Sequence, residues 1–190
     1  MPTTSAPALH TSPPTAFVLS RMANVPLILG FDPGLKHTGY GALQAMPRRP
    51  EVFGVGVLST LEGQDLGHRL HQLHNEVQNL LREFRPDLVV LEDLFAHSRF
   101  PRTAIILGHV RGVICLAAAA SGVRVMALAP SVVKRAVAGS GRASKPQVQA
   151  ALRTLLGLRA LSNSHAADAL ALAYAGMARA DIGRPGSVKP

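Results

Sequence analysis

An apolar run of strand length stops at a single acid, Asp32, and a turn containing glycine follows, within residues 27–41 (LILGFDPGLKHTGYG). A second apolar run, residues 88–92 (LVVLE), also ends on a carboxylate. Burying such a charge without a partner is costly. If the two strands are neighbours in one sheet, both acids converge at one edge, where a divalent cation would relieve their repulsion. The two runs therefore predict a metal site.

The spacing of apolar residues along the chain predicts an α/β fold. Residues 40–44 and 52–58 have strand character and are separated by the basic turn MPRRP, so with the first run they give three antiparallel strands. Apolar residues at helical spacing predict an amphipathic helix from Leu66 to Phe84 that covers one face of the sheet. We further expect a strand over residues 123–128 and three helices: a short one after Pro130, then residues 144–156 and 164–177.

The helix expected from about Thr103 to Ser121 is apolar nearly all round. Such a helix must be buried on more than one side, so it lies deep in the domain or supplies a subunit interface as well. Arg111 interrupts its apolar stretch well short of the roughly 20 residues that a membrane span requires, so we expect no membrane span. Cys115 lies in the same stretch and fits a small buried hydrophobe.

Length and composition bound the domain organisation. A chain of 190 residues that is 47% hydrophobic suits one domain with a sizeable core. We place that domain at residues 26–180. Residues 1–25, rich in Pro, Ser, Thr and Ala and without the apolar core of a signal peptide, are expected to be a disordered extension, and residues 181–190 a flexible tail. A cytoplasmic location is the default expectation.

The charge balance points to a polyanionic partner. Lysine and arginine total 20 against 11 acidic residues, which gives a formal charge of +9. If three of the acids are committed to a metal, the remaining surface is strongly positive. Nucleic acid is the favoured partner, with an acidic membrane face as the weaker option.

A third acid is found in the alanine-rich segment SNSHAADALALAYAG, where His165 and Asp168 are three residues apart and share a helix face. Small residues would let this helix approach the sheet and bring both side chains beside Asp32 and Glu92. Oxygen ligands with few nitrogens suit magnesium or manganese better than zinc. Such a site hydrolyses phosphodiesters, usually with a pair of ions ~3.5 to 4 Å apart.

Four separated segments carry a family resemblance: residues 27–41, VVLEDLF, residues 129–148 (APSVVKRAVAGSGRASKPQV) and SHAADALALAYA. In this order and at this spacing they resemble the motifs of the RuvC Holliday junction resolvases, over residues 27–178. The resemblance implies a ribonuclease H-like α/β fold, with a central mixed five-stranded sheet flanked by helices. It implies a homodimer that resolves four-way DNA junctions by paired symmetric nicks in recombination and repair. A partnership with a branch-migration motor complex of the RuvA and RuvB type is also implied.

By position, the resemblance places the metal-binding and catalytic acids of the family on Asp32, Glu92 and Asp168, with two divalent ions expected per subunit. Its fourth position falls on His165, where well-known members carry aspartate and others histidine. Imidazole removes one negative charge and adds a nitrogen ligand, which manganese accepts more readily than magnesium. We therefore expect Mn²⁺ to be favoured over Mg²⁺.

The resemblance also implies residues that contact DNA. It places a base-wedging aromatic on Phe95 and basic groups near the cut strand on Lys134 and Lys145. Weaker candidates for phosphate contacts are Arg99, Arg102, Arg135 and Arg142. Taken alone, a phenylalanine after a strand fits a core residue and a lysine fits a solvated surface charge, so these roles depend on the resemblance.

Three other functions fit parts of the sequence. The pattern D-x-G-x-x-x-T-G at Asp32 also suits a phosphate-binding hairpin of an actin-like or sugar-kinase phosphotransferase, but that architecture requires a second domain of comparable size. A ribonuclease of the same fold, cutting RNA in hybrids, would share the metal chemistry but not the interface-type helix. A protein that only binds junctions through its charge would leave the ordered acids without a purpose.

Overall fold

A mixed sheet of five strands forms the centre of the molecule in the computed structural model, which describes residues 22, 25–93, 101–161 and 163–180. The strands are β1 (Leu27–Asp32), β2 (His37–Gln44), β3 (Glu51–Ser59), β4 (Leu88–Glu92) and β5 (Arg124–Leu128), in the order β3-β2-β1-β4-β5. The three strands β1 to β3 pair antiparallel, whereas β4 runs parallel to β1 and β5 parallel to β4. The expected extension and tail, at residues 1–21, 23–24 and 181–190, lie outside the described residues.

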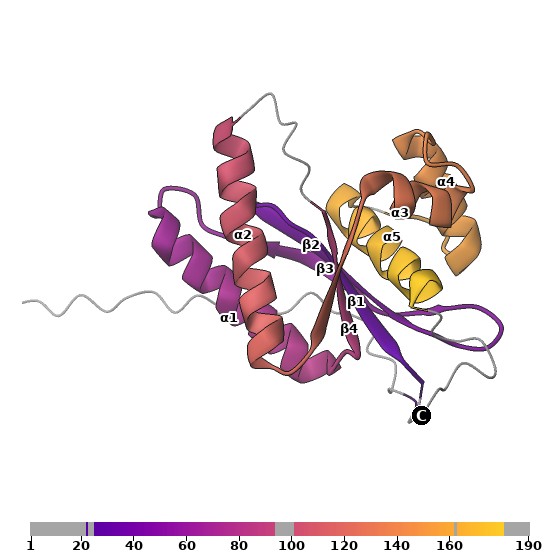
Figure 1. The fold of residues 1–190 in the computed structure, drawn as a ribbon, viewed down its shortest axis with the longest axis horizontal. Helices are drawn as coiled ribbons and strands as arrows, with labels where there is room; N and C mark the ends of the chain where they lie inside the picture. The colour runs from indigo at the N-terminus through magenta and orange to yellow at the C-terminus, as the bar shows by residue number, and fades with distance from the viewer. Residues whose placement is uncertain (1–21, 23–24, 94–100, 162, 181–190) are drawn as a thin grey trace, which may run out of the picture.

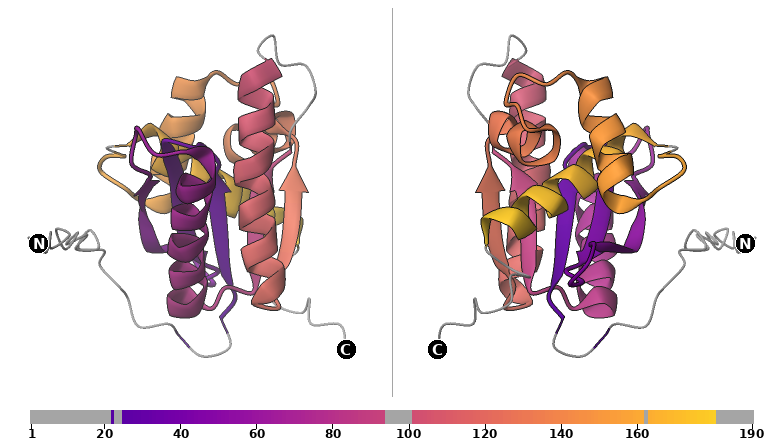
Figure 2. Two further views of the ribbon diagram at one scale, coloured as in Figure 1. Left: turned by 90° about the vertical axis from the view of Figure 1, so that its left-hand side faces the viewer. Right: turned by 90° about the vertical axis from the view of Figure 1, so that its right-hand side faces the viewer.

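Helices cover both faces of the sheet, as Figures 1 and 2 show. One face carries α1 (Leu66–Phe84) and α2 (Pro101–Ala120). The other face carries α5 (Ser164–Arg179), with α3 (Pro130–Ala138) and α4 (Lys145–Leu156) packed around it. The layered architecture confirms the expected α/β fold with a mixed five-stranded sheet.

Strand alternation divides the core into two clusters. In β1, Leu27, Leu29 and Phe31 are buried against α1 and α2, whereas Ile28 is buried in the cluster on the α5 side. In β4, Val89 and Leu91 belong to the first cluster, and Leu88 and Val90 to the second. Because side chains alternate along a strand, every even-numbered residue of β1 and β4 faces α5.

The helix α5 lies unusually close to the sheet because glycines and alanines form the contact. A Cβ added at Gly30 would overlap the carbonyl oxygen of Ala169, and one added at Gly39 would overlap that of His165. Larger residues at either strand position would push the helix away from the sheet. The small-residue contact therefore fixes the height of α5 above β1 and β2.

The helix α2 corrects one expectation. Residues Arg102–Ala120 are long and apolar enough, by length and composition, to cross a membrane, so Arg111 does not exclude such a span as we expected. Of this window, 22% is buried, and the helix packs on α1 and beside β5. Its exposed side carries Ile105 and Leu116, so the helix is not buried all round and the interface alternative stays open.

Candidate active site

The parallel register of β1 and β4 brings two acids to one sheet edge. Ile28 pairs with Leu88, and the register continues to Phe31 and Leu91. Asp32 and Glu92 are the next residues of their strands, and both are even-numbered, so they lie side by side on the α5 face. Each is only partly exposed.

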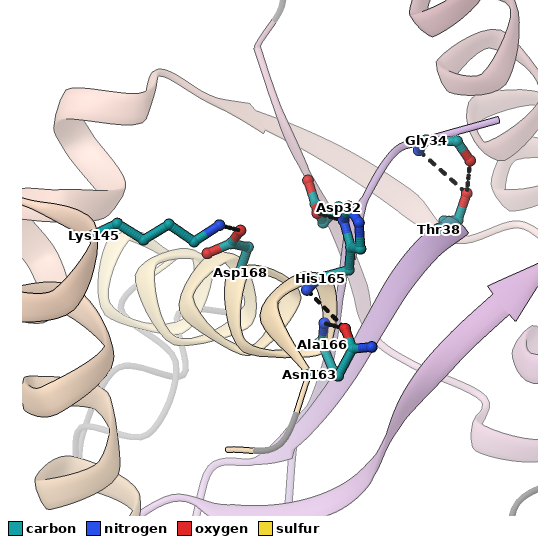
Figure 3. Close-up of polar contacts among 8 residues, drawn as sticks. All are labelled: Asp32, Gly34, Thr38, Lys145, Asn163, His165, Ala166 and Asp168. Carbon is teal, nitrogen blue, oxygen red and sulfur yellow. Dashed lines mark hydrogen bonds and ion pairs between the residues drawn. The ribbon is translucent and has the colours of Figure 1, made fainter. Parts of the chain in front are cut away.

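The first turn of α5 places His165 over this edge. Asn163 caps the helix: its Oδ1 accepts hydrogen bonds from the backbone N–H groups of His165 (2.8 Å) and Ala166 (3.2 Å). The imidazole Nδ1 of His165 then lies 2.7 Å from Oδ2 of Asp32 (Figure 3). The capped helix end therefore holds the imidazole against a carboxylate that β1 positions.

One turn further along α5, Asp168 pairs with a lysine from a different helix. Lys145 Nζ lies 2.6 Å from Asp168 Oδ2, as Figure 3 shows. Lys145 is the first residue of α4, whose N-terminus is fixed by a capping box between Ser144 and Gln147. The start of α4 is thereby attached to the same site as the start of α5.

A pocket of about 260 Å³ joins these groups. Its polar lining comes from three acids and two lysines on five elements, namely Asp32, Glu92, Lys134, Lys145 and Asp168. Its apolar wall comes from α3, α4 and α5, through residues that include Val133, Val148 and Leu172. The pocket thus contains three of the predicted ligands together with both predicted lysines, and His165 stands beside it on Asp32.

The three carboxylates repel one another. Burial raises the pKa of Glu92 above its ordinary value, and the charges of Asp32 and Asp168 raise it further. Burial also raises the pKa of Asp32, although the hydrogen bond from His165 opposes the shift. The positive charges of Lys134 and Lys145 oppose this rise in the pKa of Glu92. A cation placed among the carboxylates would relieve both the burial cost and the repulsion.

The donor set fits a hard divalent ion. Three carboxylates line the pocket and one imidazole lies beside it, and oxygen-rich sites with a single nitrogen suit Mg²⁺ or Mn²⁺. Across the described part of the chain, no three His, Cys, Asp or Glu side chains are gathered closely enough to form a ready-made metal site. Two of the carboxylates are instead engaged with His165 and Lys145.

The structure places only some of the expected DNA contacts near this site. Lys134 and Lys145 line the pocket, whereas the other described candidates are exposed on α2, α3 and the loop after α3, namely Arg102, Arg135 and Arg142. Phe95 and Arg99 lie outside the described residues.

Two positioning residues escape the sequence reasoning. Asn163 has the visible signal of a cap before an alanine-rich helix. Arg111 donates a hydrogen bond to the backbone oxygen of Glu92, but nothing in the sequence around it indicates that contact. Asn163 holds the predicted ligand His165 in place, and Arg111 does the same for Glu92.

A mixed sheet covered on both faces, with carboxylates converging at one edge, defines a nuclease of the ribonuclease H-like fold. The model of the family described as "Crossover junction endodeoxyribonuclease RuvC" matches residues 28–175. The chain therefore belongs to the RuvC family.

Curated relatives support this assignment over most of the chain. The crossover junction endodeoxyribonuclease RuvC of Rhodopirellula baltica is 39% identical over 163 residues, which cover 85% of this chain and 92% of the relative. The structure of Thermus thermophilus RuvC superposes with a TM-score of 0.75 at 33% identity and covers 82% of this chain and 97% of its own. The structure of T. thermophilus RuvC in complex with Holliday junction substrate gives a TM-score of 0.74 at 31% identity, and it covers 83% of this chain and 96% of its own.

The raised pKa of Glu92 predicts that this carboxylate destabilises the metal-free fold. The pKa of Glu92 is higher in the folded than in the unfolded state, so folding favours the protonated carboxyl. As the pH rises through the folded-state pKa, this stabilising contribution is lost, and at neutral pH the ionised carboxylate destabilises the fold. We expect Glu92→Gln to raise Tm by a few degrees at pH 7 in EDTA. The gain in Tm should vanish below pH 4.5, the ordinary pKa of a glutamate, because the carboxyl is then neutral in both the folded and the unfolded state.

Thermal unfolding followed by circular dichroism between pH 4 and 8 measures this effect. Glu83→Gln makes the same change at an exposed position of α1, on the opposite face of the sheet, and is the matched control. A Glu92→Gln variant that is no more stable than the wild type at pH 7 would contradict the electrostatic account.

Proposed function

We propose that this chain is a structure-selective DNA endonuclease that resolves Holliday junctions by paired symmetric nicks, in homologous recombination and DNA repair. Membership of the family and the junction complex of the Thermus thermophilus relative support the substrate. One observation carries the chemistry: three carboxylates from β1, β4 and α5 and two lysines from α3 and α4 line one pocket. Acids that bind cations beside bases that bind phosphate are the parts that phosphodiester hydrolysis requires.

Asp32, Glu92, Asp168 and His165 would hold the divalent ions, two per subunit. When bound, such ions activate water and stabilise the departing 3′ oxygen of the scissile phosphodiester. His165 orients Asp32 through its Nδ1, and Asn163 fixes His165 through the helix cap.

The two lysines of the pocket would neutralise the phosphate of the strand to be cut. Lys145 has a double role, because it neutralises Asp168 in the structure and also lines the pocket in which the phosphate would lie. Lys134 lines the same pocket from α3, and its charge opposes part of the rise in the pKa of Glu92.

Asp32→Asn separates this function from its rivals. We expect the wild type with Mn²⁺ to make paired nicks in a synthetic four-way junction and to leave a linear duplex and an RNA/DNA hybrid intact. Asp32→Asn should lower the cleavage rate by at least ~10³-fold while junction binding persists, because a metal ligand is removed but the basic surface remains. Gel analysis of end-labelled junctions measures both properties.

Each rival gives a different result in the same assay. Cleavage of the hybrid would favour a ribonuclease, ATP turnover would favour a phosphotransferase, and binding without nicking would favour a junction-binding protein. Glu83→Gln, at an exposed position of α1 on the opposite face of the sheet, should cut like the wild type. Any of the rival outcomes overturns the proposed function.

We also propose that Mn²⁺ is favoured over Mg²⁺, because His165 stands where a further carboxylate would add charge. At saturating ion the wild type should cut faster with Mn²⁺. His165→Asp should narrow the difference, since it restores an all-oxygen ligand set that suits Mg²⁺. Single-turnover cleavage rates with each ion test this, and equal wild-type rates with both ions would refute the preference.

A homodimer fits the two-fold symmetry of paired nicks, and α2 offers the surface for it. A shallow apolar groove runs along its exposed side, lined by Leu70 of α1 and by residues of α2: Ile105, Gly108, His109, Gly112, Val113 and Leu116. Ile105 and Leu116 are 61% and 62% exposed in the single chain. We propose that a second copy covers this groove.

The proposals of a cytoplasmic location and of a branch-migration motor partner depend on the family resemblance.

Leu116→Glu tests the interface. Placing a charge in this apolar contact should convert the dimer to a monomer and abolish paired nicking. The monomer should stay folded, because Leu116 is exposed within one chain. Sedimentation velocity and circular dichroism measure the two properties. Leu61→Glu, at a residue 44% exposed before α1, is the control and should remain dimeric. A Leu116→Glu dimer of wild-type stability would argue against this face.

A further inference from the structure

A row of basic and polar residues leads away from the pocket along α4. Lys145, Gln149 and Arg153 are spaced four residues apart, so they form one row on the helix. The neighbouring row, Val148, Leu152 and Leu156, is buried in the core. The whole helix of 12 residues extends about 18 Å from the end at which Lys145 contacts Asp168.

The far end of α4 meets the turn between β2 and β3. Gly157 caps the C-terminal end of the helix, and a Cβ added at Gly157 would overlap the guanidinium of Arg49. Arg48, the neighbour of Arg49, is exposed. Figure 1 shows this β2–β3 loop and α4 on the same side of the molecule. The contact places the MPRRP turn at the end of the row that starts at the active site.

The surface so formed is strongly positive. Residues 45–51 and 145–161 together hold five basic residues and one acid, Glu51. Between Asp93 and Asp168 the sequence contains no aspartate or glutamate at all. Arg153 and Arg159 are both exposed. The ratio of five bases to one acid in these two segments exceeds the ratio of 20 bases to 11 acids in the whole chain.

The length of α4 matches a short stretch of duplex DNA. Each strand of B-DNA carries one phosphate per ~3.4 Å of helix axis, so ~18 Å of axis spans about five base pairs. Arginines at the far end of the helix would therefore meet phosphates about half a helical turn from the cut. The two prolines of the turn, Pro47 and Pro50, restrict the backbone that presents Arg48.

We propose that the α4 row and the MPRRP turn form an arm-binding surface, which holds the phosphates of a junction arm about five base pairs from the scissile phosphate. This inference rests on the proposed function, and it assigns a role to Arg48, Arg49 and Arg153 that the chemistry of the pocket does not require. Arg49 also packs on the end of α4, where a cation is favourable, so Arg48 and Arg153 are the cleaner probes.

Equilibrium binding of the full chain to a four-way junction, in EDTA to prevent cutting, tests the surface. Arg48→Ala and Arg153→Ala should each reduce the slope of log K against log salt by about 0.9, the value expected for one phosphate that is no longer neutralised. Arg82→Ala removes the same charge from α1, on the opposite face of the sheet, and should leave the slope unchanged. Thermal unfolding of each variant checks that the fold is intact.

Neutral methylphosphonate linkages locate the contact on the DNA. Placed four to six base pairs from the crossover, they should weaken binding of the wild type but have little effect on an Arg48→Ala/Arg153→Ala variant. Placed beyond one helical turn they should affect neither protein. Wild-type affinity and slope in the double variant would overturn the arm-binding surface, as would equal sensitivity of both proteins to the linkages.

The two proposals fail in different ways. If the chain cuts junctions but the variants bind like the wild type, the arm-binding surface is wrong and the resolvase function stands. If the variants lose affinity but the wild type neither prefers nor cuts junctions, the surface binds DNA and the resolvase function is wrong.

Discussion

The parallel register between β1 and β4 is the constraint on which the site depends. Because Ile28 pairs with Leu88, the strand ends bring Asp32 and Glu92 together, and because side chains alternate, both acids face α5. A slip of one residue would turn Glu92 toward α1 and α2 and bury a carboxylate in an apolar cluster. Because β4 has apolar residues on both faces of the sheet, those residues alone would tolerate the slip, and the cost of burying the Glu92 carboxylate opposes it.

The small residues between sheet and helix convert this register into a site. Asp168 and His165 reach the sheet edge only because α5 lies directly on Gly30 and Gly39. The same close approach partly buries the carboxylates, which raises the pKa of Asp32 and of Glu92. The packing that creates the site therefore also creates its electrostatic cost. His165 and Lys145 relieve part of this cost within the protein.

Much of the fold can be predicted from the sequence because the signals are local. Apolar runs that stop at an acid predict β1 and β4, and helical spacing predicts α1 with the bounds that the structure has. The strand β2 begins three residues earlier than expected, since His37 and Thr38 are polar and resemble a turn. Thr38 is in fact buried, and its hydroxyl donates to the backbone oxygen of Gly34, which closes the turn (Figure 3).

Contacts between distant elements have no such signal. In the sequence Arg111 is only a break in an apolar helix, yet it crosses from α2 to the backbone oxygen of Glu92, 19 positions earlier in the chain. The pairing of Lys145 with Asp168 joins residues 23 positions apart, and nothing in either segment indicates the other. The family resemblance singles out Lys145, but the ion pair depends on how α4 meets α5.

The distribution of charge over the molecule is constrained by the three carboxylates of the site. A site built from three carboxylates repels a phosphate backbone, so an enzyme that uses it must attract the substrate elsewhere. Under the proposed function this attraction would begin within the pocket, which Lys134 and Lys145 line, and would continue along a region of the sequence that contains no acid. Three acids meet at the sheet edge where cations are needed, whereas α3 and α4 around the pocket carry bases and no acid. Under the proposed function, the excess of positive charge offsets the repulsion between the partly buried carboxylates and the phosphate backbone.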